Sequence, residues 1–324
     1  MISKEFDLQS VSFASAFAGA MDKNLTIMQQ VCNVQLSGRG QIVQVTGDEA
    51  DVDVFMKSAT RILDLIKDTG YVDEQTILYC INLVKEGADD SITELQEGFL
   101  LISSHGKPIR PKTLGQKKFV ESIEKNTITF GVGPAGTGKT YLSVVKAVAA
   151  LKKHEISRII LTRPAVEAGE KLGFLPGDLQ NKIDPYLRPL YDALFDTLGP
   201  ESFQKNVEKG IIEVAPLAYM RGRTLDNAFI ILDEAQNTSS EQMKMFLTRL
   251  GNGSKMVVNG DITQIDLPEG KKSGLIEALK ILEGINDISV IRFTKKDIVR
   301  NKLVMDIVAA YDKLKPASNV RSKK

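Results

Sequence analysis

The sequence predicts an α/β protein whose main domain is a largely parallel β-sheet with helices on both faces, preceded by a small α+β domain. Two observations predict this class. Short runs rich in Ile and Val, without polar alternation, recur between stretches of helical pattern, as in parallel sheets that are buried on both faces. A glycine-rich loop, GPAGTGKT, follows the first of these runs and precedes an amphipathic helical pattern.

Six apolar runs are the expected strands of the main sheet, and they are Ile128–Val132, Arg158–Thr162, Gly210–Ala215, Phe229–Asp233, Met256–Gly260 and Ile288–Phe293. Between the fourth and fifth runs we expect a helix over Ser240–Leu250 that ends at Gly251, because glycine favours the left-handed position after a helix.

The first part of the chain predicts a smaller unit. The stretch CNVQLSGRGQIVQVTGD indicates a hairpin, and helices are expected from Asp48 and over Asp73–Lys85. The segment His105–Thr113 contains two prolines and several basic side chains, which is typical of a linker. We therefore predict a domain over residues 1–104, a second over 105–315, and a flexible basic tail over 316–324.

The composition limits the classes of function. The chain has 324 residues, of which 43% are hydrophobic, and 42 Lys and Arg balance 41 Asp and Glu. A strongly basic nucleic-acid-binding protein is thereby excluded, although a local basic stripe is not. Two cysteines and two histidines make a disulfide framework, a zinc cluster or a histidine metal site improbable. No apolar run approaches the roughly 18 residues of a membrane span, so we expect a cytoplasmic protein without a membrane partner.

The loop GPAGTGKT, Gly133–Thr140, fits the phosphate-binding pattern G-x-x-x-x-G-K-[ST]. Its glycines let backbone N–H groups point inward around a phosphate, and the following helix adds its positive end. Lys139 supplies a cation for the β- and γ-phosphates, and the Thr140 hydroxyl is a Mg²⁺ ligand. The Gln116 amide is suited to bind the adenine edge. The expected nucleotide-binding residues are Gln116, Gly133, Pro134, Ala135, Gly136, Thr137, Gly138, Lys139, Thr140 and Tyr141.

An acidic pair ends the fourth apolar run. Asp233 is placed to hold Mg²⁺ opposite Thr140, and Glu234 can polarise an attacking water. The alternative is an ordinary charge pair at a helix N-terminus, which the phosphate loop makes less favoured. The pair favours hydrolysis over phosphoryl transfer to a small molecule. Downstream, Gln264 in the stretch GDITQ is suited to sense the γ-phosphate or the water.

A guanine-reading pattern, NKID at Asn181–Asp184, also occurs. In guanine-nucleotide switches this element follows the acidic strand, whereas here it precedes Asp233. We therefore expect ATP and Mg²⁺, not GTP.

The motif set Gln116, GPAGTGKT, LTRPA, LDEAQ and GDITQ resembles the first lobe of superfamily-1 helicases. Over about residues 105–312 the longer blocks, such as PLAYMRGRTLDNAFIILDEAQNT and FTKKDIVRN, resemble the PhoH-like ATPase family. This resemblance implies a RecA-like P-loop core, ATP binding and a role linked to RNA, and it implies, more weakly, a KH-like N-terminal region. The sequence has Asn259 where the family usually has Thr, and Asn301 where His is usual.

Helicase-type ATPases need an arginine to stabilise the transition state. Because only about sixty residues follow GDITQ in this sequence, we do not expect a second lobe within it to supply one. A neighbouring subunit of a ring, which we expect to be hexameric, is the alternative source, with Arg300 and Arg249 as candidates. For Arg300 an ion pair with Asp297 or Asp306 is equally open.

The expected partners are RNA, single-stranded or ribosomal, and further copies of the chain. Arg163, Arg221 and Arg223 flank strands and are candidates for RNA phosphates, although solvated loop charge explains the last two equally well. The SGRG turn at Ser37–Gly40 is not the G-x-x-G loop of a true KH domain. The runner-up function is an ATP-gated scaffold for an endoribonuclease or a ribosome-assembly partner, without unwinding activity. A small-molecule kinase is third.

Overall fold

The computed structural model describes residues 1–88, 92, 99–164, 179–268 and 270–300, and the short pieces 303–304, 307–308 and 310–311. For Arg39 and residues 179–186 it describes the backbone alone. The chain divides into two compact units. One contains Met1–Ile92 together with Val299–Lys324, and the other contains Thr93–Ile298.

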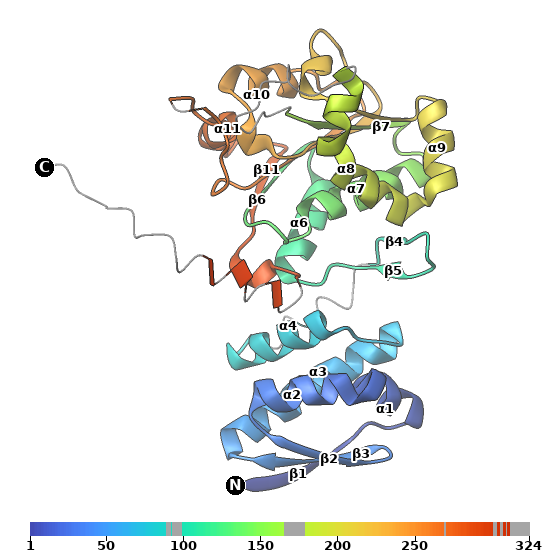
Figure 1. Cartoon of the computed structure of the whole chain (residues 1–324), viewed down its shortest axis with the longest axis vertical. Coiled ribbons are helices and arrows are strands. Elements are labelled where there is room, and N and C mark those ends of the chain that lie inside the picture. Colours follow the sequence, from blue (N-terminus) through green and yellow to red (C-terminus); the bar gives the residue numbers. More distant parts are fainter. Residues whose placement is uncertain are drawn as a thin grey trace, which may run out of the picture. The chain divides into compact units, whose positions relative to one another are not determined.

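The first unit is the small α+β domain that the sequence predicts. Its antiparallel sheet has the order β1-β3-β2, and helices cover one face of it (Figure 1). The predicted hairpin is confirmed, because β2 and β3 pair directly. The elements are β1 (Ile2–Asp7), α1 (Val11–Ala18), η1 (Ala20–Asp22), α2 (Lys23–Cys32), β2 (Gln35–Arg39), β3 (Ile42–Gly47), α3 (Glu49–Thr69) and α4 (Glu74–Lys85).

The helix α3 shows why this unit folds as it does. Apolar side chains recur along one face at helical spacing, among them Val52, Phe55, Ile62 and Ile66, and each of these four is fully buried. Gly70 ends the helix in the left-handed conformation, where its N–H binds the Ile66 carbonyl.

The predicted linker over His105–Thr113 has structure of its own. β4 (Leu101–Ile102) and β5 (Pro108–Ile109) form a two-stranded antiparallel hairpin. Leu101 and Ile109 belong to a core cluster of the second unit. A domain boundary after residue 104 therefore separates two paired strands, and the division between the units falls between Ile92 and Thr93 instead.

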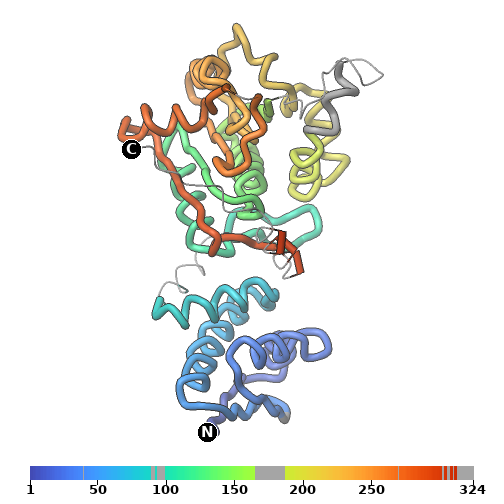
Figure 2. The backbone as a smooth tube through the Cα atoms, turned by 60° about the vertical axis from the view of Figure 1, so that its left-hand side comes forward, coloured from blue at the N-terminus to red at the C-terminus, as the bar shows by residue number. Residues whose placement is uncertain are grey.

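The second unit contains a six-stranded sheet with the order β11-β6-β10-β9-β7-β8, and every pair of neighbours is parallel. The six predicted strands are confirmed within two residues at either end. They are β6 (Ile128–Val132), β7 (Arg158–Arg163), β8 (Ile212–Pro216), β9 (Ala228–Leu232), β10 (Lys255–Gly260) and β11 (Ile288–Arg292). Figure 2 shows β11 (orange-red) beside β6 (green), although a long stretch of chain separates them in sequence.

Two helix layers cover this sheet, one on each face (Figure 1). One core cluster joins the sheet to α6 (Leu114–Lys125), α7 (Lys139–Lys152), α8 (Leu179–Leu198) and α9 (Pro200–Glu208). The other joins it to α10 (Ser240–Leu247) and α11 (Gly274–Leu282). Each layer buries side chains from every second position of the strands, which explains the unbroken apolar runs.

The helix α10 ends earlier than predicted, at Leu247, and Gly251 is not its terminal glycine. The reason lies in the following residues. The backbone of Arg249 accepts a hydrogen bond from the Leu225 N–H, and Leu250 forms a β-bridge with Leu225. A side chain at Gly251 would approach the Asp226 carboxylate, so this glycine permits close packing and not a left-handed turn.

The order of strands decides where the polar ends of the strands meet. β10 lies between β6, which leads into the phosphate loop, and β9, which leads into the acidic pair. Parallel strands present their carboxyl ends at one edge of the sheet, and ligands of open α/β sheets bind there. The loop after β6, the pair after β9 and the start of the GDITQ stretch therefore lie at the same edge. No helix among the described residues is long and apolar enough to cross a membrane.

Candidate active site

The phosphate loop connects β6 to α7, and two of its glycines are required by the backbone. Gly138 precedes the helix in the left-handed conformation, with φ of 80°. Gly133 has φ of 152°, and a Cβ atom there would lie 2.6 Å from the carbonyl oxygen of Phe293. The Gly133 N–H also donates to the Gly260 carbonyl at 3.0 Å, which ties the loop to the end of β10. Side chains at these two positions would deform the loop.

Lys139 is the loop lysine, and in this structure it closes the loop on itself. Its Nζ donates to the carbonyl oxygens of Gly133 at 2.7 Å and Pro134 at 2.8 Å. The side chain is almost completely buried, at 8% exposure. A second contact supports the helix behind it: Asn259 donates to the Ser143 hydroxyl, which donates to the Lys139 carbonyl. Asn259 thus supports the first turn of α7.

Thr140, in the first turn of α7, and Asp233, which directly follows β9, lie side by side. The Thr140 hydroxyl donates to the Asp233 carboxylate at 2.7 Å. Burial raises the pKa of the Asp233 carboxyl above its ordinary value, and the neighbouring Glu234 charge acts in the same direction. The Arg163 guanidinium and the Thr140 hydroxyl act in the opposite direction. A buried carboxylate beside a hydroxyl is suited to a divalent cation, since such an ion stabilises the charged form.

One hydroxyl and one carboxylate fit Mg²⁺ that is bound together with substrate phosphates better than they fit a metal ion held by protein side chains alone. Mg²⁺ prefers oxygen ligands and is usually bound through one or two side chains together with substrate phosphates. Among the described residues no group of three or more His, Cys, Asp and Glu side chains is placed to hold a metal. Thr140 and Asp233 would therefore contribute the hydroxyl and carboxylate oxygens.

Glu234 is held in an uncommon backbone conformation and by two side chains. Its φ of 52° lies in the left-handed region, which few residues other than glycine adopt. Arg163 Nη2 lies 2.7 Å from one carboxylate oxygen, and Gln236 Nε2 donates to the other at 2.6 Å. Residues in this region cluster at functional sites, where neighbouring contacts hold them. Gln236 was not assigned a role from the sequence, although it lies inside the LDEAQ motif.

Asp261 and Gln264 lie between the two halves of the site. The Asp261 carboxylate accepts hydrogen bonds from the Ala135 N–H of the phosphate loop at 3.2 Å and from Gln264 Nε2 at 2.8 Å. Gln236 bridges to this segment as well, because its amide binds both the Asp261 N–H and the Gln264 carbonyl. Gln264 is thus brought to the site, and a network of hydrogen bonds connects it with Glu234.

Two predicted nucleotide contacts are placed differently from expectation. The Gln116 amide lies against the loop, but it donates to the Thr137 carbonyl and accepts from the Lys112 N–H. Adenine would have to replace these bonds, so its recognition by Gln116 stays a prediction. The Tyr141 hydroxyl binds Asp196 of α8 at 2.6 Å. Its side chain therefore serves packing, and its backbone N–H is the part directed toward the start of α7.

The candidate arginines differ in their partners. Arg163, considered for RNA, has its guanidinium on the acidic pair, 3.3 Å from Asp233 as well as 2.7 Å from Glu234. Arg249 binds the Met245 and Arg223 carbonyls, and Arg223 forms a two-fold ion pair with Glu213. These two side chains are engaged in local structure, away from the acidic pair.

Arg300 follows Ile298, the last residue of the second unit, and that unit does not contain it. Its role in completing the site stays a prediction. The Asp297 carboxylate, one alternative partner of Arg300, binds Thr113, Gly115 and Thr294. Asp306 and Asn301 lie outside the described residues, and so does the last residue of the LTRPA motif with the stretch that follows it, residues 165–178. The NKID residues lie in α8, where the backbone alone is described.

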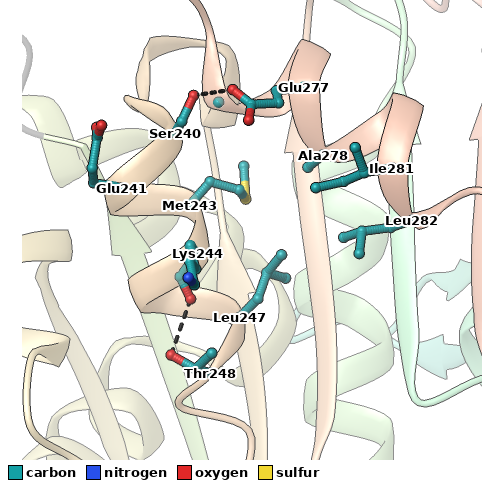
Figure 3. A pocket seen from close by; sticks show the side chains of 11 residues that line it. Ser240, Glu241, Met243, Lys244, Leu247, Thr248, Glu277, Ala278, Ile281 and Leu282 are labelled. Atoms are coloured by element: carbon teal, nitrogen blue, oxygen red, sulfur yellow. Dashed lines mark hydrogen bonds between the residues drawn. The ribbon is translucent and has the colours of Figure 1, made fainter.

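An apolar groove lies elsewhere in the second unit. Its volume is about 540 Å³, and it runs between α10 and α11, where Met243, Leu247 and Ile281 line it (Figure 3). Ser240 and Glu277 join the two helices at its end. None of the loop or acidic-pair residues line it, and nothing in the structure shows what covers it.

The comparisons with known proteins show the family of this chain. The family model described as "PhoH-like protein" matches residues 108–312. The chain belongs to the PhoH-like protein family. A PhoH-like protein of Bacillus subtilis (strain 168) is 51% identical over 306 residues, which cover 94% of this chain and 96% of the relative. Another, of Mycobacterium tuberculosis (strain ATCC 25618 / H37Rv), is 53% identical over 293 residues, which cover 90% and 83%.

A solved structure, "Crystal structure of the UvsW helicase from Bacteriophage T4", aligns with 14% identity and a TM-score of 0.34, covering 72% of this chain and 77% of that one. The family model and the two relatives confirm the resemblance drawn from the motifs at the level of the PhoH family. The family, the phosphate loop and the parallel sheet together support an ATPase-type role for the PhoH-like chain.

Proposed function

We propose that this PhoH-like protein is a Mg²⁺-dependent ATPase that hydrolyses ATP and acts on RNA or ribosomal complexes. One observation carries the proposal: the Thr140 hydroxyl and the Asp233 carboxylate, 93 positions apart, meet at 2.7 Å beside the phosphate loop. This is the pairing that P-loop NTPases use to hold the ion that bridges the β- and γ-phosphates. Bound Mg²⁺ would withdraw charge from those phosphates.

The remaining residues divide the chemistry among them. In hydrolysis the oxygen of water bonds to the γ-phosphorus while the bond from that phosphorus to the bridging oxygen breaks. ADP leaves with the bonding electrons, and the proton of water passes to a base. Glu234, 42% exposed and next to Asp233, is the residue placed to orient the water and take that proton. Lys139 neutralises charge on the phosphates once it exchanges its loop carbonyls for them.

The choice of RNA as partner is supported by the resemblance of the motif blocks to helicases. A ring of copies acting in the cytoplasm remains part of the proposal. The alternative, an ATP-gated scaffold for an endoribonuclease or a ribosome-assembly partner, uses the same site.

The decisive measurement is the rate of ATP hydrolysis with and without single-stranded RNA. We compare the natural protein with Glu234→Gln, which keeps the size of the side chain and removes the charged base. Glu201→Gln, an exposed glutamate of α9, is the matched control. We expect Glu234→Gln to bind ATP and to lose turnover, while the control stays active.

Two outcomes would change the proposal. Loss of ATP binding together with turnover in Glu234→Gln would make Glu234 a structural residue or a metal ligand. Turnover that is indifferent to RNA, with a stable protein partner in pull-downs, would favour the scaffold.

A further inference from the structure

We propose that Arg163 supplies the positive charge that stabilises the transferred phosphoryl group, and that it acts within its own chain. This inference rests on the proposed ATPase function. It concerns the source of the arginine, for which a neighbouring subunit was the expectation from the sequence.

The position of Arg163 follows from the sheet. It is the last residue of β7, and β7 pairs with β9 in parallel so that Thr162 lies opposite Leu232. The Asp233 N–H then donates to the Thr162 carbonyl at 2.9 Å. The register of two central strands therefore fixes Arg163 beside the acidic pair, and no loop movement is needed to bring it there.

The guanidinium contacts both carboxylates that would surround the reacting phosphate. It lies 3.3 Å from Asp233 Oδ2, and the other oxygen of Asp233 binds Thr140 in the phosphate loop. It lies 2.7 Å from Glu234, the residue placed to activate water. In P-loop NTPases the metal bridges the β- and γ-phosphates and the base orients the water that attacks the γ-phosphorus, so both residues lie next to the γ-phosphate. A group that touches both is therefore adjacent to that phosphate.

The contact with Glu234 must be exchanged before the reaction. Both carboxylate oxygens of Glu234 are engaged, one by Arg163 and the other by Gln236. A guanidinium binds phosphate oxygens with the same planar fork that it offers to carboxylates. When ATP enters, Arg163 moves from Glu234 to the γ-phosphate, and one oxygen of Glu234 becomes available for the proton of water. A single exchange thus supplies the cation and releases the base.

Of the two arginines named for this role from the sequence, Arg249 is engaged elsewhere. It uses its guanidinium on the Met245 and Arg223 carbonyls, next to the end of α10. Arg163 reaches the pair with a side chain that is 17% exposed, where a charge is screened less than at the surface.

The test separates chemistry from binding. We replace Arg163 by Ala and by Lys, and we use Arg292→Ala as the control, since Arg292 is exposed on β11 and pairs with Glu283. The maximal turnover is measured at saturating ATP, and the affinity for a fluorescent ADP analogue is measured separately by titration. For Arg163→Ala we expect turnover to fall by about 10²-fold or more, with nucleotide affinity changed only a few-fold. Arg163→Lys should recover part of the loss, and the control should match the natural protein.

A mixture of Arg163→Ala and Glu234→Gln chains tests whether the arginine acts within the chain. In the mixture every chain lacks either Arg163 or Glu234. A site that needs both residues from one chain therefore stays inactive, and we expect no recovery of ATP turnover. Recovery of turnover in the mixture would overturn the proposal, because it requires an arginine from a neighbour. Unchanged maximal turnover in Arg163→Ala, with weaker binding alone, would also overturn it and make Arg163 a structural counter-ion. Failure of the proposed ATPase function itself is distinguishable, since then the natural protein and the Arg292→Ala control would not hydrolyse ATP either.

Discussion

Lys139 shows how single residues determine this site. Its ammonium group binds two carbonyls of its own loop, a third contact reaches the Thr137 hydroxyl at 3.3 Å, and the ring of Phe293 lies 6.0 Å away. The sequence predicted the role of this residue from the motif alone. It could not predict these resting contacts, because they depend on how β11 and the loop approach each other.

Replacing Lys139 with Ala should reduce ATP hydrolysis by roughly two orders of magnitude or more, since it removes the cation nearest the transferred phosphate. Steady-state turnover is the measurement, and circular dichroism verifies that the fold is retained. Lys152→Ala, at the far end of the same helix, is the control and should be fully active. Unchanged turnover in Lys139→Ala would refute the assigned site.

The limits of prediction at this scale are clear from Arg163. Its neighbours in the sequence indicate a strand end, which is correct, and a strand-end arginine was reasonably assigned to an RNA phosphate. Its actual partners, Asp233 and Glu234, lie about 70 positions further along the chain. The order of strands in the sheet decides which strand lies next to β7. The local sequence pattern around Arg163 does not reveal that order.

At the scale of elements, the strands were predictable because parallel strands buried on both faces give unbroken apolar runs. Helix ends were less so. The end of α10 depends on pairing of Leu250 with Leu225, which are distant in sequence, so the local glycine signal was misleading. The linker expected over His105–Thr113 was wrong for a similar reason, since its two prolines lie beside and within a hairpin whose apolar residues join the core.

Packing between α10 and α11 gives a prediction about stability. A Cβ atom at Gly274 would lie within 2.3 Å of the Ser239 carbonyl oxygen, a backbone atom that cannot easily move. We expect Gly274→Ala to lower the free energy of unfolding by about 1–3 kcal/mol, as overpacking does. Gly38→Ala, where the nearest atom is 3.7 Å away, is the control and should be close to neutral. Urea denaturation of both variants measures the difference, and equal midpoints would contradict the close approach.

At the scale of the whole molecule, the second unit contains the phosphate loop, the acidic pair and Arg163 in one sheet. If Arg163 completes the site as proposed, the chemistry does not depend on a neighbouring chain. The size of any ring and the identity of the RNA were not readable from the sequence, because both depend on surfaces and not on motifs.

Dilution tests this independence. If Arg163 acts within the chain, ATP turnover per chain should stay constant across a dilution series, even where light scattering shows that assemblies dissociate. The mixed-subunit experiment uses variants, whereas this one uses the natural protein. A fall in turnover that follows the dissociation curve would indicate that a neighbouring chain supplies the arginine, and it would favour Arg300.

The phosphate loop has hydrogen-bond partners within the protein: Lys139 binds the Gly133 and Pro134 carbonyls, and Asp261 accepts from the Ala135 N–H. This has a consequence for the second half of the catalytic cycle. When the product leaves, the Lys139 ammonium group and the Ala135 N–H can form these hydrogen bonds again. Release therefore leaves neither a buried charge nor a backbone N–H without a partner. The net affinity for nucleotide is therefore the difference in free energy between two hydrogen-bonded states, the loop bound to nucleotide and the loop bound to its protein partners. Such a loop is suited to repeated exchange of its occupant, and a protein that passes through a desalting column should emerge without nucleotide.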